Sequence, residues 1–189
     1  LLGYSSSSHA GYLLLGVAAL NASGQAAVLY YLAGYLFTVL AGFFVIVIVL
    51  RHLDTEDISG LAGLNQRSPL LAATMTISMV SLAGIPPLAG FFGKFLLLKS
   101  VVEAAQTPGH HGYYWLVFIA LAGVVISLYY YFGVIRAIYW SKEAKDLSAI
   151  ELSAPAKLTA WICIAGIFWL GLFPNTVLNI AIQAVSALK

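Results

Sequence analysis

Two adjacent prolines, Pro86 and Pro87, interrupt a long apolar run of the sequence, and a lysine, Lys94, follows them within the same run. Proline has no amide hydrogen, so the carbonyls of Leu82 and Ala83 lose their helical donors and a helix must break here. An ionisable side chain at membrane depth costs about 2.5–3.5 kcal/mol on insertion scales and usually lines a bundle interior or a water-filled path. We therefore expect a membrane protein that moves an ion or a proton.

The composition indicates the same class of protein. Of the 189 residues, 61% are hydrophobic and only 8% are charged, whereas soluble domains carry about 25% charged residues. The sequence contains no basic run that would indicate a nucleic-acid partner, and its single cysteine, Cys163, cannot form an internal disulfide. The chain starts on an apolar, serine-rich segment without a signal-peptide pattern, so we expect it to be part of a longer membrane protein.

Hydropathy predicts an all-α integral membrane region over residues 1–189, with about five transmembrane helices of about 20 residues or more. The predicted spans are residues 3–20, 26–50, 69–105, 113–139 and 157–188. The third span would be roughly 55 Å long as one straight helix, well beyond a hydrocarbon core of about 30 Å. We expect two half-helices there, joined by an irregular turn at Gly84–Pro87. Pro174 also interrupts the last apolar segment.

Basic residues predict the orientation of the spans, because cytoplasmic loops carry an excess of lysine and arginine. The loops after the second and fourth spans, with their flanks, carry all six basic residues that bear on this rule: Arg51, Arg67, Arg136, Lys142, Lys145 and Lys157. The opposite loops, 21–25 and 106–112, carry none. We expect the basic loops to be cytoplasmic and the C-terminus to lie on the outer side.

Lys94 is the first candidate for chemistry, since an amine held away from water among aromatic residues can accept and release a proton. The alternatives are a lysine paired with a buried carboxylate and a lysine that extends to the membrane interface. Lys99 and Glu103 stand four residues apart on the same predicted helix. They form either a surface ion pair or an outward relay for the proton of Lys94.

His9 lies in the first span beside several hydroxyl groups, at Ser5, Ser6, Ser8 and Tyr12. Histidine titrates near neutral pH and can shuttle protons, and Ser8 and Tyr12 are possible relay residues next to it. A histidine that donates to a neighbouring carbonyl is the other interpretation.

The remaining polar positions indicate less. The run Tyr129-Tyr130-Tyr131 is typical of an aromatic belt at a membrane interface. The hydroxyls of Thr74, Thr76, Ser78 and Ser81 either bond back to their own helix or line a hydrated path. No phosphate-binding loop, dinucleotide fingerprint, cysteine cluster or hydrolase triad appears in the sequence, so we expect no cofactor and no metal in this chain.

Two motifs resemble a known family. The segment YSSSSHAGYLLLG, residues 4–16, resembles the Y-S-S-I-[AS]-H-x-G-Y segment of the N subunits of proton-pumping NADH:quinone oxidoreductase, respiratory complex I. The segment SLAGIPPLAGFFGKF, residues 81–95, is similar to the broken twelfth helix of that family, with the family's lysine at Lys94. The related M subunits typically have glutamate at this position, which favours the N type. Ser7 and Ser8 depart from the family pattern, which often has Ile-Ala or Ile-Ser there.

The resemblance implies an antiporter-like fold with two inverted five-helix repeats, of which this chain would carry most of the second. It implies that Lys94 is the terminal lysine of a polar axis in the middle of the membrane and that His9 lies on the connecting path. It further implies proton translocation coupled to electron transfer from NADH to quinone, by a complex whose other subunits handle NAD, flavin, iron–sulfur clusters and quinone. The expected partners are M-, K- and J-type membrane subunits and lipid, in a bacterial inner membrane, and the fragment alone is not expected to be active.

Two alternatives stay open. The L subunits and the Mrp-type sodium/proton antiporters also carry a lysine at this position, in a different local context, so the chain could belong to a secondary antiporter. It could also be a structural subunit of a membrane complex without a transport path of its own.

Overall fold

The computed structural model describes residues 1–52, 57–140 and 148–187, and the regular structure in these ranges is entirely helical. This confirms the predicted all-α class. The elements, in chain order, are α1 (Leu2–Ala18), α2 (Ala22–Leu50), the short 3₁₀ turn η1 (Ile58–Leu61), α3 (Leu64–Arg67), α4 (Pro69–Ala83), α5 (Ala89–Ala105), α6 (Tyr113–Trp140), α7 (Ala154–Leu172) and α8 (Pro174–Ala187).

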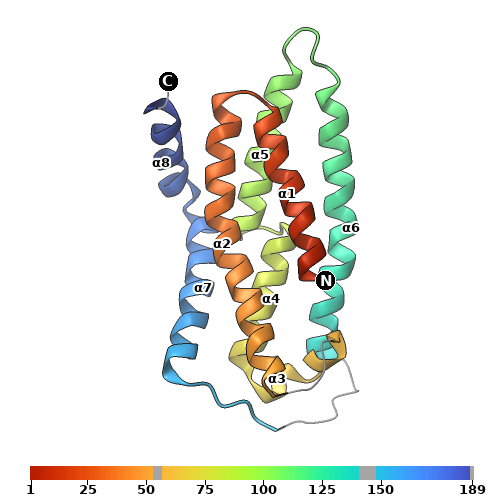
Figure 1. The fold of residues 1–189 in the computed structure, drawn as a ribbon, viewed down its shortest axis with the longest axis vertical. Coiled ribbons are helices and arrows are strands. Elements are labelled where there is room, and N and C mark those ends of the chain that lie inside the picture. Colours follow the sequence, from red (N-terminus) through yellow and green to blue (C-terminus); the bar gives the residue numbers. More distant parts are fainter. Residues whose placement is uncertain (53–56, 141–147, 188–189) are drawn as a thin grey trace.

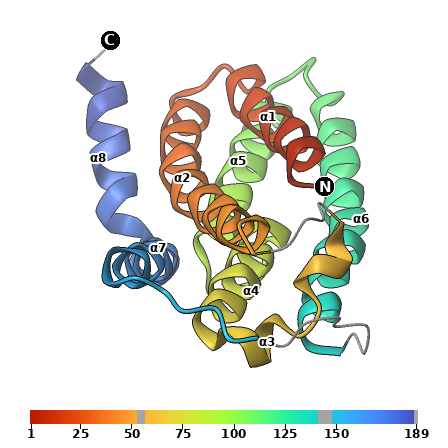
Figure 2. The same cartoon turned by 60° about the horizontal axis from the view of Figure 1, so that its bottom comes forward.

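The long helices run roughly along the long axis of the molecule (Figure 1). Helix α2 is the centre of the bundle, because it packs against α1, α4, α5, α7 and α8. Helices α4 and α5 follow one another along the axis beside α2 (Figure 1). At the edge of the bundle α8 continues from the end of α7, and Figure 2 shows that it leaves α7 at an angle.

Three helices in the described part of the chain, α2, α6 and α7, are long and apolar enough to cross a membrane alone. Helix α4 has 15 residues and α5 has 17, so neither half reaches the 20 or so residues that a hydrocarbon core requires. Together they form one discontinuous element, as predicted. Helix α4 ends at Ala83, the residue after it, Gly84, is left-handed with φ 84°, and α5 starts at Ala89.

A second interruption divides the predicted span 157–188 at Phe173. Pro174 has no amide hydrogen, so the carbonyl of Leu170 loses its helical donor. The hydroxyl of Tyr30 on α2 donates to that carbonyl instead, at 2.6 Å. The end of α7 packs on the first break, since the Cα of Gly171 lies so close to the Pro87 carbonyl and the Leu88 backbone that a side chain there would collide with both.

The ends of α2 and α6 and the starts of α4 and α7 lie at one end of the bundle (Figure 1), so the basic loops share one side of the molecule. Arg51, Arg136 and Lys157 are exposed there. Arg67 is instead buried, and its Nε donates to the Ser148 carbonyl at 3.4 Å. Lys142 and Lys145 lie outside the described residues, as does the last residue of the predicted fifth span, residue 188.

We predict that Gly171→Ala lowers the free energy of unfolding by about 1–3 kcal/mol, because the added methyl group meets backbone atoms that cannot move aside. Unfolding of the purified protein in mild detergent by titration with SDS would measure the change. Gly133→Ala is the matched control, since a Cβ at that helical position has open space. Equal stabilities of the two variants would contradict the close packing of α7 on the break.

Candidate functional site

The amine of Lys94 lies at the break between α4 and α5, away from solvent. The residue is 5% exposed. Its Nζ donates to the carbonyls of Leu82, at 2.7 Å, and Ala83, at 3.4 Å. These are the carbonyls that Pro86 and Pro87 leave without helical donors, so the side chain takes the place of the missing amides.

Gly84 gives this amine its space. Its φ of 84° is rarely adopted by residues with a side chain. A Cβ at this position would lie 3.0 Å from Cδ of Lys94. Gly84, the residue that caps the end of α4, therefore also sets how closely Lys94 can approach the free carbonyls.

His9 is buried in α1 and is held by two tyrosines from other helices. Its Nδ1 shares a hydrogen bond with the hydroxyl of Tyr31 on α2. Its Nε2 shares one, at 3.1 Å, with the hydroxyl of Tyr131 on α6. Tyr131 is also hydrogen-bonded to the hydroxyl of Ser5, one turn before His9.

This arrangement can accommodate a change of proton number at both titratable groups. A neutral imidazole donates from one nitrogen and accepts at the other, and an imidazolium donates from both. Because a phenol hydroxyl can donate or accept, Tyr31 and Tyr131 can partner His9 in either state. The two carbonyls beside Lys94 accept from an amine as well as from an ammonium group. Neither site must lose its hydrogen bonds when a proton arrives or leaves.

Tyr12 connects the two groups. Its ring centroid lies 5.0 Å from Nζ of Lys94 and 6.3 Å from the centre of the His9 ring. The first distance is within the range of a cation–π contact. The Tyr12 hydroxyl donates to the Ala120 carbonyl of α6 at 2.9 Å.

A cavity of about 260 Å³ between α1, α5 and α6 reaches Lys94, and Ser8, Tyr12, Ser127 and Tyr130 contribute its polar groups. A second cavity, of about 10 Å³, borders His9. That volume is close to the minimum for one water molecule, about 10–15 Å³.

Hydroxyl groups connect the small cavity to the helix break. Thr38 and Ser81, which line it, have their side-chain oxygens 3.1 Å apart. Ser81 also accepts from the amide of Gly90 in the first turn of α5, at 3.2 Å. Of the hydroxyls that the sequence singles out in α4, Thr74 and Thr76 bond back to their own helix, and Thr76 also donates to the Tyr139 hydroxyl of α6 at 3.4 Å. Ser78 donates to the Thr38 carbonyl of α2, and Ser81 contacts the Thr38 hydroxyl.

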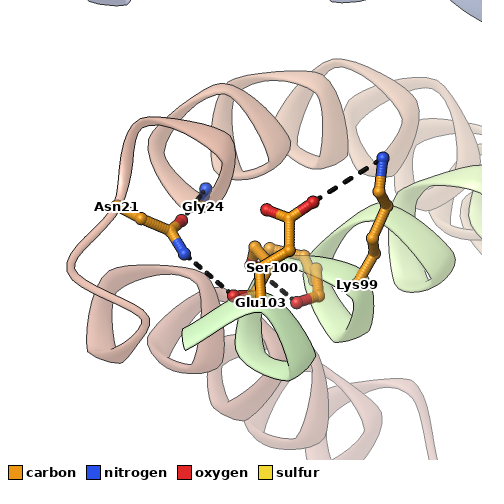
Figure 3. Close-up of polar contacts among 6 residues, drawn as sticks. Asn21, Gly24, Lys99, Ser100 and Glu103 are labelled. Carbon is orange, nitrogen blue, oxygen red and sulfur yellow. Dashed lines mark hydrogen bonds and ion pairs between the residues drawn. The ribbon is translucent and has the colours of Figure 1, made fainter. Parts of the chain in front are cut away.

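Lys99 and Glu103 lie apart from this cluster, near the end of α5. They form an ion pair with 3.7 Å between the charged atoms, and their side chains are 59% and 37% exposed. Figure 3 shows the pair on α5 beside the α1–α2 turn, where the side chain of Asn21 donates to the Ser100 carbonyl at 2.9 Å. The structure thus brings together Lys94, His9, Tyr12 and Ser8 around one site and places the ion pair elsewhere.

The sequence interpretation missed the two tyrosines that hold His9. The run Tyr129-Tyr130-Tyr131 predicts an interfacial belt, and Tyr129 is indeed 88% exposed, but Tyr131 is 1% exposed. The sequence interpretation also omits Tyr31, which is 3% exposed. Its position one helical turn before Tyr35, on one face of an apolar helix, is the only signal that could have found it. Among the described residues, no three histidine, cysteine or acidic side chains are grouped as a metal site requires.

Comparisons with known proteins place these features in a family. Residues 1–127 match the sequence profile described as "NADH:quinone oxidoreductase/Mrp antiporter, TM". The chain is 42% identical over its full length to NADH-quinone oxidoreductase subunit N 2 of Syntrophobacter fumaroxidans and 38% identical to subunit N of Heliobacterium modesticaldum. In both cases it covers 38% of the relative, so it spans less than two fifths of the length of these curated relatives.

A solved structure agrees with the sequence relatives. The structure described as respiratory complex I from Thermus thermophilus with bound aureothin contains a similar chain, with a TM-score of 0.75 and 30% identity. The similarity covers 95% of this chain and 39% of that one. The antiporter-like helical fold expected from the resemblance is therefore confirmed.

We predict that Tyr31→Phe lowers the free energy of unfolding by about 1–3 kcal/mol, because a buried nitrogen of His9 loses its partner. Tyr35→Phe is the control. Its hydroxyl donates to Ser6, at 3.1 Å, and Ser6 keeps a further bond to the Leu2 carbonyl. SDS titration of both variants in mild detergent would measure the difference. A Tyr31→Phe protein no less stable than Tyr35→Phe would contradict the assigned role of the tyrosine.

Proposed function

The chain belongs to the NADH:quinone oxidoreductase/Mrp antiporter transmembrane family, and on this basis we propose that it is part of an N-type membrane subunit of proton-pumping NADH:quinone oxidoreductase. In this proposal, electron transfer from NADH to quinone elsewhere in the complex drives protons through the subunit. The relatives named subunit N support the N type over other members of the family.

The observation that carries the proposal is the buried amine of Lys94 on two carbonyls that the helix break exposes. A fixed structural cation would be matched by an anion, since an unpaired buried charge is costly. The partners of Nζ in the described part of the chain are instead neutral acceptors and an aromatic ring. Such a site holds the lysine in place while its charge changes.

We place His9 on the inner side of the same path. A proton that reaches His9 can pass toward Lys94 beside Tyr12, whose ring neighbours His9 and which lines, with Ser8, the cavity that reaches Lys94. Loss of a proton from Lys94 then leads to the outer side. Lys99 does not contact this route, so we propose no relay through the Lys99–Glu103 pair.

The assembly and orientation follow from the same proposal. The partners are the other membrane subunits, of the M, K and J types, and the redox cofactors belong to subunits outside this chain. The subunit crosses a bacterial inner membrane with the end that carries Arg51, Arg136 and Lys157 toward the cytoplasm. Its C-terminus then faces the outer side, at the opposite end of the bundle (Figure 1).

We expect Lys94→Ala in the full-length subunit to lower proton pumping by the assembled complex about tenfold or more, because loss of a positioned proton-transfer group typically costs about 10²–10⁴-fold in the step that it serves. Proton uptake by inverted membrane vesicles on addition of NADH would measure pumping, and a native gel would verify assembly. Lys157→Ala, an exposed lysine at the start of α7, is the control. Normal pumping by an assembled Lys94→Ala complex would leave the subunit with a structural role only.

The ion carried distinguishes the proposal from a secondary antiporter. A proton-pumping oxidoreductase subunit should work equally in sodium-free and sodium-containing buffer when NADH is supplied. An antiporter should need a sodium gradient and no NADH. Transport in the same vesicles under both conditions would decide between the two, and sodium-dependent, NADH-independent exchange would contradict the proposal.

A further inference from the structure

A groove lies between α2, α5 and α8 at the end of the bundle opposite the basic loops. Its volume is about 290 Å³. Its apolar walls come from Leu96 of α5 and from Leu178, Ile182 and Val185 of α8, and small residues of α2 form its floor. Ile182 is 50% exposed, so the groove opens to the surroundings of the bundle.

The rim of this groove is charged and rigid. Lys99 lines it, and Glu103 is its ion-pair partner one turn further along α5. Asn21 fixes the rim, because it donates to the carbonyl of Ser100 and accepts from the amide of Gly24 at 2.7 Å (Figure 3). The turn between α1 and α2 is thereby tied to the segment of α5 that presents the two charges.

The pair lies near the end of α5. Lys99 lies six residues before the end of α5, which corresponds to about 9 Å along the helix. The apolar walls of α8 continue from there toward the middle of the bundle. Lysine binds phosphate as a point charge, so a lysine at the rim of an apolar groove can hold a lipid phosphate over its acyl chain.

We propose that this groove binds a phospholipid with a zwitterionic head group that ends in a primary amine. An acyl chain lies along the apolar walls, the phosphate accepts from Lys99, and the head-group ammonium donates to Glu103. The carboxylate selects the class, because it repels a lipid of net negative charge and because a trimethylated head group has no N–H to donate. This inference requires only that the chain lies in a membrane, and it does not depend on the proposed proton path.

The test uses the full-length subunit in its native complex, reconstituted in nanodiscs that contain equal amounts of phosphatidylethanolamine, phosphatidylcholine and phosphatidylglycerol. Native mass spectrometry after detergent release would count the lipids retained by the subunit. We expect wild type to retain phosphatidylethanolamine about tenfold over the other two, which corresponds to one charge-assisted hydrogen bond. Ser186→Trp, at an exposed position on the rim, should displace the lipid by filling the groove.

Charge variants separate the two contacts. Lys99→Gln should lower the retained phosphatidylethanolamine about tenfold, and Lys99→Arg should restore it. Glu103→Gln should remove the preference over phosphatidylglycerol while keeping a lipid bound. Lys157→Gln, which removes an exposed cation from the opposite end, should change nothing.

Three results would overturn the proposal. The first is equal retention of the three lipids by wild type, and the second is retention that Lys99→Gln and Ser186→Trp leave unchanged. The third is capture of a partner subunit, and of no lipid, when Ser186 is replaced by the photo-reactive p-benzoylphenylalanine. Loss of proton pumping in any of these variants is neither required nor excluded, so failure here leaves the proposed function standing.

Discussion

The hydrogen bonds from Lys94 to two backbone carbonyls hold the centre of this structure together. Without the lysine, the carbonyls of Leu82 and Ala83 would have no donor in an apolar environment, where each unsatisfied group costs several kcal/mol. Without the prolines, the lysine would have no free carbonyls to reach. The break and the cation therefore stabilise each other, which explains how one apolar segment can contain both.

The second break, between α7 and α8, is stabilised in the same way, but by a different hydrogen-bond donor. Pro174 frees the carbonyl of Leu170, and the hydroxyl of Tyr30 donates to it. The two breaks meet where Gly171 packs on the Pro87 carbonyl. A phenol is a donor that stays neutral at ordinary pH, whereas an amine can change its charge. One break is thus a fixed support, and the break beside it carries the titratable group.

Local rules predicted the first break and the identity of its free carbonyls, because the lack of a proline amide acts on the residue four positions earlier. The same rule explains the interruption at Pro174, which the sequence also indicates. The sequence could not predict the partners of His9, since Tyr131 is 122 residues away in the sequence and lies beside His9 only after α1 and α6 pack.

Lys99 follows Lys94 by five residues, which places it about 140° around the helix. Helical periodicity alone therefore disfavours a direct relay between the two lysines.

The shared contact with Tyr12 couples the two titratable groups. The tyrosine ring lies 5.0 Å from the Lys94 amine and 6.3 Å from the imidazole of His9. Two positive charges on either side of one ring repel each other. A proton on one group therefore disfavours a proton on the other, although each keeps its hydrogen bonds in both states. In the proposed proton path, this repulsion would couple the gain of a proton by one group to the loss of a proton by the other.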